Sequence, residues 1–223
     1  MTDFDAAIVG AGPSGTSTAI TLAKRGYRVV LIDRATFPRD KLCGDFVNPI
    51  NWRVFEELKV DQDILVRQHT KVSTFRITAA DGAEAASCLL AEGAEQQYGL
   101  GLRRYHLDHV LVERAKKDGV TVIEGGKVNG IDRDTKGWSL RIDRAGEIRT
   151  LGAKILVGAD GRNSGVARRL GVALNLPKGR SSVGFEIQLS GIRGLDGSVE
   201  IHQFPGGYAG MVRVDKDTVN LCF

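Results

Sequence analysis

The residues with the clearest chemical meaning form one glycine-rich stretch near the start of the chain. It consists of Gly10, Ala11, Gly12, Pro13, Ser14 and Gly15, a complete GxGxxG pattern. In this pattern Gly10 permits a sharp turn, Gly12 lets backbone approach a pyrophosphate, and Gly15 allows a helix to pack closely on a strand. A helix beginning at Pro13 and Ser14 would direct unpaired N–H groups at the phosphates. The stretch therefore predicts a dinucleotide-binding turn.

A carboxylate follows at a spacing that suits the same ligand. Asp33 lies eighteen residues after Gly15, directly behind the apolar stretch 27–32. An acidic residue near this distance accepts hydrogen bonds from the ribose of the adenosine. Its negative charge would repel a 2′-phosphate, so the pattern favours FAD or NAD over NADP.

Two further motifs lie later in the chain. Gly158-Ala159-Asp160-Gly161 follows an apolar run and precedes a helical pattern that begins near Ser164. Arg104 opens another helical pattern, reading Arg-Tyr-His-Leu-Asp over residues 104–108. Taken alone, Asp160 is equally well explained as a helix cap, and Arg104 as a surface charge.

The elements that must position these residues follow two kinds of pattern. Residues 4–9, 14–25 and 27–32 predict a strand, a helix and a strand with a buried parallel pairing. Elements of the same kind are expected at 106–118, 121–124, 153–158 and 164–170. By contrast, residues 71–90 and 182–223 alternate with period two, and Asp81-Gly82 supplies a hairpin turn.

The expected architecture is therefore α/β with two interleaved domains. Residues 1–70 and 101–180 would form a discontinuous nucleotide-binding domain of Rossmann type. Residues 71–100 and 181–223 would form an antiparallel β-sheet domain that binds substrate.

Composition excludes several other classes of protein. The chain has 223 residues, a net charge of +4 and 42% hydrophobic residues, so it is neither disordered nor basic enough to favour nucleic acid. Glycine is the unusual component, at 28 residues where about 16 would be ordinary. No apolar run reaches the roughly 18 residues of a membrane span, which leaves only peripheral lipid contact open.

The cysteines indicate a reduced environment. Cys43, Cys88 and Cys222 are odd in number and widely spaced, and no Cys/His cluster has the spacing of a metal site. We expect no metal ion, no disulfide framework and a cytoplasmic location.

Taken together, the four motifs resemble those of the FAD-dependent oxidoreductases of the aromatic-hydroxylase (FAD-binding monooxygenase) and geranylgeranyl reductase superfamily. The GxGxxG pattern, an acid followed by Arg (Asp33-Arg34), the Arg104 helix start and the Gly158–Gly161 turn occur in the family's order. This resemblance implies a glutathione-reductase-like FAD-binding domain.

The resemblance also implies a place for each cofactor residue. Arg34 would lie at the adenosine end of FAD, Arg104 near the pyrophosphate and ribityl chain, and Val128 would contact adenine through its backbone. Asp160 and Gly161 would approach the ribityl and pyrophosphate side.

A loop after the second strand carries a finer resemblance to geranylgeranyl reductases. Its residues Pro38, Lys41, Cys43 and Gly44 match their Pro-x-x-Lys-x-Cys-Gly stretch, which lies beside the flavin. Gly44 would let the backbone approach the isoalloxazine, and Cys43 is a low-ranked candidate for a catalytic thiol. No other catalytic residue is assigned.

The chain departs from the family at two places. Tyr208 stands where relatives carry a tyrosine, but the tryptophan of their signature is missing, which argues against halogenation. The family's third FAD motif is also absent, so we expect a chain truncated at its C-terminus.

The resemblance implies an enzyme in which NAD(P)H reduces FAD. The reduced flavin would then hydroxylate an apolar or aromatic small molecule or reduce one of its double bonds, as a prenyl or lipid reductase does. Two alternatives stay open, an NAD-dependent dehydrogenase and a non-catalytic FAD- or nucleotide-binding protein. Substrate, nicotinamide preference and oligomeric state are left undecided.

Overall fold

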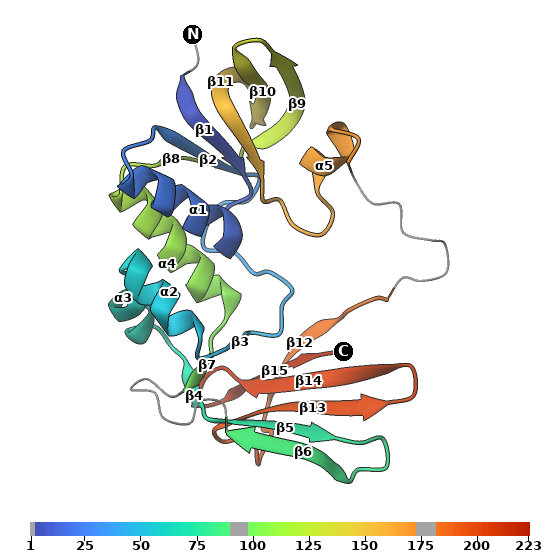
Figure 1. Ribbon diagram of the computed structural model, residues 1–223. Coiled ribbons are helices and arrows are strands. Elements are labelled where there is room, and N and C mark those ends of the chain that lie inside the picture. Colours follow the sequence, from blue (N-terminus) through green and yellow to red (C-terminus); the bar gives the residue numbers. More distant parts are fainter. Residues whose placement is uncertain (1–2, 90–97, 173–181) are drawn as a thin grey trace. The chain divides into compact units, whose positions relative to one another are not determined.

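A computed structural model describes residues 3–89, 98–172 and 182–223 (Figure 1). The chain divides into two compact units that alternate along the sequence. The first comprises Met1–Arg39 and Asp108–Gly179, and the second comprises Asp40–Leu107 and Arg180–Phe223.

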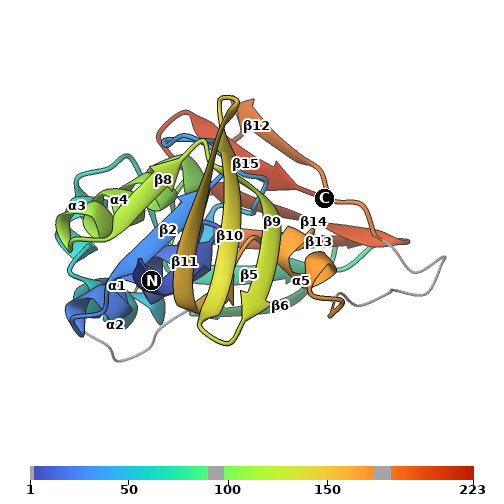
Figure 2. The same cartoon turned by 90° about the horizontal axis from the view of Figure 1, so that it is seen from above.

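The first unit is built on a six-stranded sheet. Its strands, in spatial order, are β8 (Thr121–Glu124), β2 (Val29–Asp33), β1 (Phe4–Val9), β11 (Glu147–Gly158), β10 (Gly137–Arg144) and β9 (Lys127–Asp134). The first four strands pair in parallel, whereas β11, β10 and β9 form an antiparallel ribbon, seen side by side in Figure 2. Parallel strands are buried on both faces, and the four residues from Val29 to Ile32 are accordingly almost fully buried.

Three helices contribute to this unit. Helix α1 (Pro13–Lys24) follows β1 directly and packs on β1 and β2. Helix α4 (Arg104–Lys117) enters the unit at Asp108, and the short α5 (Gly165–Arg169) follows β11. The arrangement brings the ends of β1, β2 and β11 to one edge of the sheet, where the glycine-rich turn lies.

The second unit contains a larger and a smaller sheet. The larger has the order β12 (Glu186–Ser190), β15 (Thr218–Cys222), β14 (Gly207–Arg213), β13 (Ser198–Phe204), β5 (Thr74–Thr78) and β6 (Glu84–Leu89). Its pairs are antiparallel except β13 with β5, which is parallel. The smaller sheet joins β3 (Phe46–Val47), β7 (Gly99–Gly101) and β4 (Thr70–Val72). Helices α2 (Asn51–Leu58) and α3 (Asp61–Leu65) complete the unit.

Most expected elements are present, and the α/β fold with an interleaved strand-rich unit is confirmed. Strand β11 extends further toward the N-terminus than the expected 153–158, because Gly152 and the residues before it continue its ladder with β10. The smaller sheet and α3 were not expected, since elements of two to five residues are too short to show a period. The boundaries near residues 70 and 100 fall inside the second compact unit, and the assignment of domains to cofactor and substrate stays a prediction.

No helix within the described ranges is long and apolar enough to cross a membrane.

Candidate functional site

The turn between β1 and α1 leaves no space for side chains at two of its glycines. Gly10 has φ +104°, and a Cβ on it would lie 2.3 Å from the carbonyl oxygen of Ala159. A Cβ on Gly15 would lie 1.8 Å from the carbonyl oxygen of Gly10. The helix therefore approaches the strand more closely than any other residue type permits, as the pattern predicted.

The start of helix α1 is suited to an anion. Gly12 occupies the N-cap position without any side-chain hydrogen bond, Pro13 follows it, and the first turn carries no acidic residue. Backbone N–H groups at such a terminus, together with the helix dipole, attract phosphate. The hydroxyl of Thr16 donates to the carbonyl oxygen of Gly12 at 2.8 Å. This terminus fits the pyrophosphate of a dinucleotide.

Asp33 lies beside this turn at the end of β2. Its Oδ2 accepts a hydrogen bond from the N–H of Ala11 at 2.7 Å, and its Oδ1 accepts from the N–H of Ala35 at 2.8 Å. The side chain is only partly buried. Each carboxylate oxygen can accept more than one hydrogen bond, so the group can still receive ribose hydroxyls. Arg34, the next residue, is exposed.

Asp160 lies behind the same turn and caps a helix. Its Oδ2 accepts from the N–H groups of Gly165 at 2.6 Å and Val166 at 3.1 Å, and its Oδ1 accepts from the hydroxyl of Ser164 at 2.5 Å. The capping interpretation of this residue is thus observed, and its role toward a cofactor stays a prediction. Gly161 has φ +81°, which lets the chain turn toward α5.

Val128 lies in β9, where its side chain packs against the core of the first unit. Its backbone pairs with Ile142 of β10 next to a register shift between Arg141 and Ile142. The first unit thus contains ten of the thirteen residues proposed for the cofactor, with the glycine turn, Asp33 and the Asp160 turn gathered at one edge of the sheet.

The other three, Cys43, Gly44 and Arg104, lie in the second unit. Cys43 is a half-buried free thiol whose N–H donates to Oε2 of Glu186 at 2.9 Å. Gly44 is exposed, with nothing within 4 Å of an added Cβ. The N–H of Arg104 donates to Oδ1 of Asp45 at 2.9 Å.

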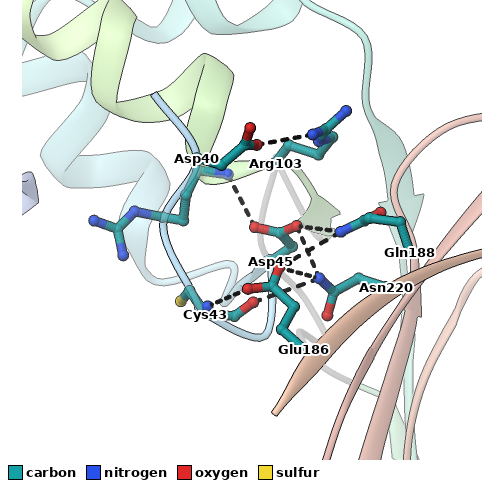
Figure 3. A network of polar contacts seen from close by, with 8 residues as sticks. Asp40, Cys43, Asp45, Arg103, Glu186, Gln188 and Asn220 are labelled. Atoms are coloured by element: carbon teal, nitrogen blue, oxygen red, sulfur yellow. Dashed lines mark hydrogen bonds and ion pairs between the residues drawn. The ribbon is translucent and has the colours of Figure 1, made fainter. Parts of the chain in front are cut away.

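Asp45 is the centre of a polar network that sequence reasoning missed (Figure 3). Only 4% of this residue is exposed, and it has φ +49°. Its Oδ2 accepts from Nδ2 of Asn220 at 3.0 Å and Nε2 of Gln188 at 3.4 Å. The pKa of the Asp45 carboxyl is raised to about 6, chiefly by burial and in part by the nearby Glu186 carboxylate. In the sequence Asp45 is only a charged residue within a loop, and such side chains ordinarily lie in solvent.

An open cavity of about 440 Å³ adjoins this network. Its walls include Leu42, Asp45, Arg104, Tyr105, Glu186 and Ile187. Cavities of roughly 300–1,000 Å³ suit small ligands. The cavity therefore combines apolar surface with both signs of charge.

Comparison with known proteins identifies the family of the chain. The FAD binding domain family matches residues 3–196. The chain belongs to this family, which confirms the resemblance to FAD-dependent oxidoreductases and favours FAD over NAD as the nucleotide.

Two curated relatives and one solved structure illustrate which proteins the chain is similar to. Conditioned medium factor receptor 1 of Dictyostelium discoideum is 28% identical over 232 residues, covering 97% of this chain and 45% of the relative. Menaquinone reductase of Mycolicibacterium smegmatis is 31% identical over 175 residues, covering 76% of this chain and 40% of the relative. A geranylgeranyl bacteriochlorophyll reductase-like structure from Thermoplasma acidophilum has a TM-score of 0.83 at 21% identity, covering 99% of this chain and 56% of that one. The chain thus spans about half the length of the proteins it matches.

Proposed function

We propose that this chain supplies the FAD-binding part, and part of the substrate layer, of an oxidoreductase that takes electrons from NADH or NADPH and reduces a carbon–carbon double bond of an apolar small molecule. The observation that carries the proposal is the turn at Gly10–Gly15 with Asp33 bonded to its backbone. Such an arrangement would place N–H groups for the pyrophosphate and an acceptor for the ribose side by side.

We assign the proposed cofactor contacts as follows. Gly12, Pro13 and Ser14 would face the pyrophosphate, while Asp33 and Arg34 would lie at the adenosine end. Val128, Arg104, Asp160 and Gly161 complete the proposed contacts, and Cys43 and Gly44 would lie beside the flavin ring. Bound FAD would supply the hydride, and the chain would orient it and exclude water.

The larger sheet of the second unit has a surface that would suit an apolar substrate. Residues directly opposite one another on paired strands project from the same face. The register therefore places Ile77, Ile201, Gly210 and Cys222 in one row across four strands, and all four are only partly buried. Glu186 ends this row on β12. An apolar molecule lying on the row would reach a polar group at that end.

Reduction is favoured over hydroxylation because the relatives include a menaquinone reductase. A cytoplasmic location is supported by the free thiols of Cys43 and Cys222.

The test is an anaerobic reaction of the FAD-loaded protein, first with NADH or NADPH and then with a short-chain menaquinone. Bleaching of the flavin by a nicotinamide is expected, followed by recovery of the oxidised spectrum and by a menaquinone that stays heavier by two hydrogen atoms after any quinol has been oxidised back to the quinone. Product formation only in the presence of O₂, with one oxygen atom added, would establish hydroxylation instead. If neither NADH nor NADPH reduces the flavin, the chain is an FAD-binding protein without turnover, and the proposed function is wrong.

A further inference from the structure

Two carboxylates of the second unit are joined by the same pair of side-chain amides (Figure 3). Nδ2 of Asn220 donates to Oε1 of Glu186 at 2.6 Å and to Oδ2 of Asp45 at 3.0 Å. Nε2 of Gln188 lies 3.5 Å and 3.4 Å from the same two oxygen atoms. Asn220 is completely buried, so this bridge is held firmly in place. The amides therefore keep the two acids next to each other.

Among residues 3–89, 98–172 and 182–223, the hydrogen-bond donors to these two acids are all neutral. Besides the amides, the N–H of Arg104 donates to Asp45 and the N–H of Cys43 donates to Glu186. Two neighbouring carboxylates without a cation bonded to them repel each other, and burial makes the charged form of Asp45 more costly. A proton bound by Asp45 relieves both penalties.

The surrounding charged groups are compatible with one exchangeable proton. Burial raises the pKa of Asp45 most and Glu186 raises it too, whereas the N–H of Arg104 and the charge of Arg103, just before α4, lower it, and the resulting pKa is about 6. Cys222 on β15 stays a protonated thiol, because burial and the same carboxylates raise its pKa to about 11. Asp40 and Lys41, on the loop that carries Asp45, and the Arg104 side chain complete the charged groups lining the cavity.

The pair is accessible to a ligand. Asp45 and Glu186 both line the cavity of about 440 Å³. Glu186 also ends the apolar row formed by Ile77, Ile201, Gly210 and Cys222 on the larger sheet. A molecule lying on that row would place one end against the acids.

We propose that Asp45, paired with Glu186, is the proton donor for the molecule that occupies this cavity. The inference rests on the proposed reduction. In that reduction the π bond of the substrate would break, a hydride supplied by bound, reduced FAD would form one new C–H bond, and the Asp45 proton would form the other. Asp45 would be left as a carboxylate beside Glu186 and would regain its proton from water, with the flavin oxidised.

The test compares wild type with Asp45→Asn and Glu186→Gln, using NADPH or NADH as reductant and a short-chain menaquinone as the probe. Glu57→Gln, which removes an exposed carboxylate from α2, is the matched control. Nicotinamide should reduce the flavin in all four proteins, and at the wild-type rate in Glu57→Gln. Reoxidation by the quinone should slow about 100-fold or more in Asp45→Asn, within the range of general-acid catalysis. In wild type the reoxidation rate should fall as pH rises above about 6, and this dependence should disappear in Asp45→Asn.

A second readout needs no turnover. Carbon-13 NMR of the side-chain carboxyls should show one Asp of the wild-type protein titrating near pH 6, and that signal should be lost in Asp45→Asn and shifted toward lower pH in Glu186→Gln. Suppose that nicotinamide reduces the flavin but that the flavin of Asp45→Asn is reoxidised with the wild-type rate and pH profile. The assignment of Asp45 as proton donor is then overturned, and the proposed function stands. An Asp45 carboxyl that titrates near 4 overturns it equally. A flavin that nicotinamide does not reduce overturns the proposed function itself.

Discussion

The N–H of Ala11 donates a hydrogen bond to Oδ2 of Asp33 at 2.7 Å, which ties the carboxylate at the end of β2 to the turn that begins α1. Asp33 both stabilises the turn and is the proposed ribose acceptor. The geometry of the N–H groups proposed to bind phosphate therefore depends on the position of this side chain.

Replacing this carboxylate should weaken FAD binding. Asp33→Ala removes the bond to Ala11 and the proposed bonds to ribose, and hydrogen bonds to charged groups contribute about 1.5–3 kcal/mol each. The dissociation constant for FAD should rise about 10- to 100-fold, as measured by titration of flavin fluorescence. Asp132→Ala, at an exposed position of β9 in the same unit, should leave the constant unchanged. Equal effects of the two substitutions would contradict a role for Asp33.

Substitution of Gly10 in the glycine-rich turn should destabilise the protein more than substitution of a glycine with similar backbone angles elsewhere. Gly26→Ala, at φ +84° with nothing within 4 Å, should cost only the left-handed penalty of about 1–2 kcal/mol. Gly10→Ala, at φ +104° with a Cβ 2.3 Å from the Ala159 oxygen, should lose a further 1–3 kcal/mol or so through overpacking. Urea unfolding measures both. Indistinguishable losses would mean that the close approach to Ala159 does not exist.

A buried ion pair explains the aspartate of the Arg-Tyr-His-Leu-Asp motif. Asp108 is completely buried, and its Oδ2 lies 3.0 Å from Nη1 of Arg39. Removing one partner of a buried pair costs about 3–5 kcal/mol, so Arg39→Met should lower the free energy of unfolding by about that amount. Arg53→Met breaks an exposed pair with Glu57 and should change it by less than about 1 kcal/mol.

Asp45 should make the stability of the protein depend on pH. Its pKa is raised from 3.8 to about 6, chiefly by burial. The folded state therefore binds this proton more tightly than the unfolded state, and the stability that it contributes is lost as pH rises from about 4 through 6. Between pH 4 and 7 the free energy of unfolding of Asp45→Asn should rise relative to wild type by on the order of 2 kcal/mol. A constant difference across this range would show that Asp45 has an ordinary pKa.

The sequence was informative where function depends on neighbouring residues. Gly10, Gly15 and Asp33 act through local geometry, so the pattern alone predicted the turn, the helix and the carboxylate beside it. The Asp45 network could not be foreseen, because its amide partners lie 143 residues away at Gln188 and 175 residues away at Asn220. Only the register of β12 and β15 brings them together.

Parallel pairing in the larger sheet was hidden for a related reason. Alternation with period two predicts a strand and its faces, but it does not determine which neighbour the strand pairs with. Strand β13 lies beside β5 in parallel, more than 100 residues away in the sequence. Asp160 illustrates the converse, since its capping interpretation was visible in the sequence and is observed.

The most direct test of the central claim is equilibrium binding of FAD, followed by flavin fluorescence and by the absorbance of protein recovered from gel filtration. The account predicts a yellow protein that quenches FAD fluorescence and loses affinity in Asp33→Ala but not in Asp132→Ala. A colourless protein that leaves the fluorescence of added FAD unchanged would contradict it.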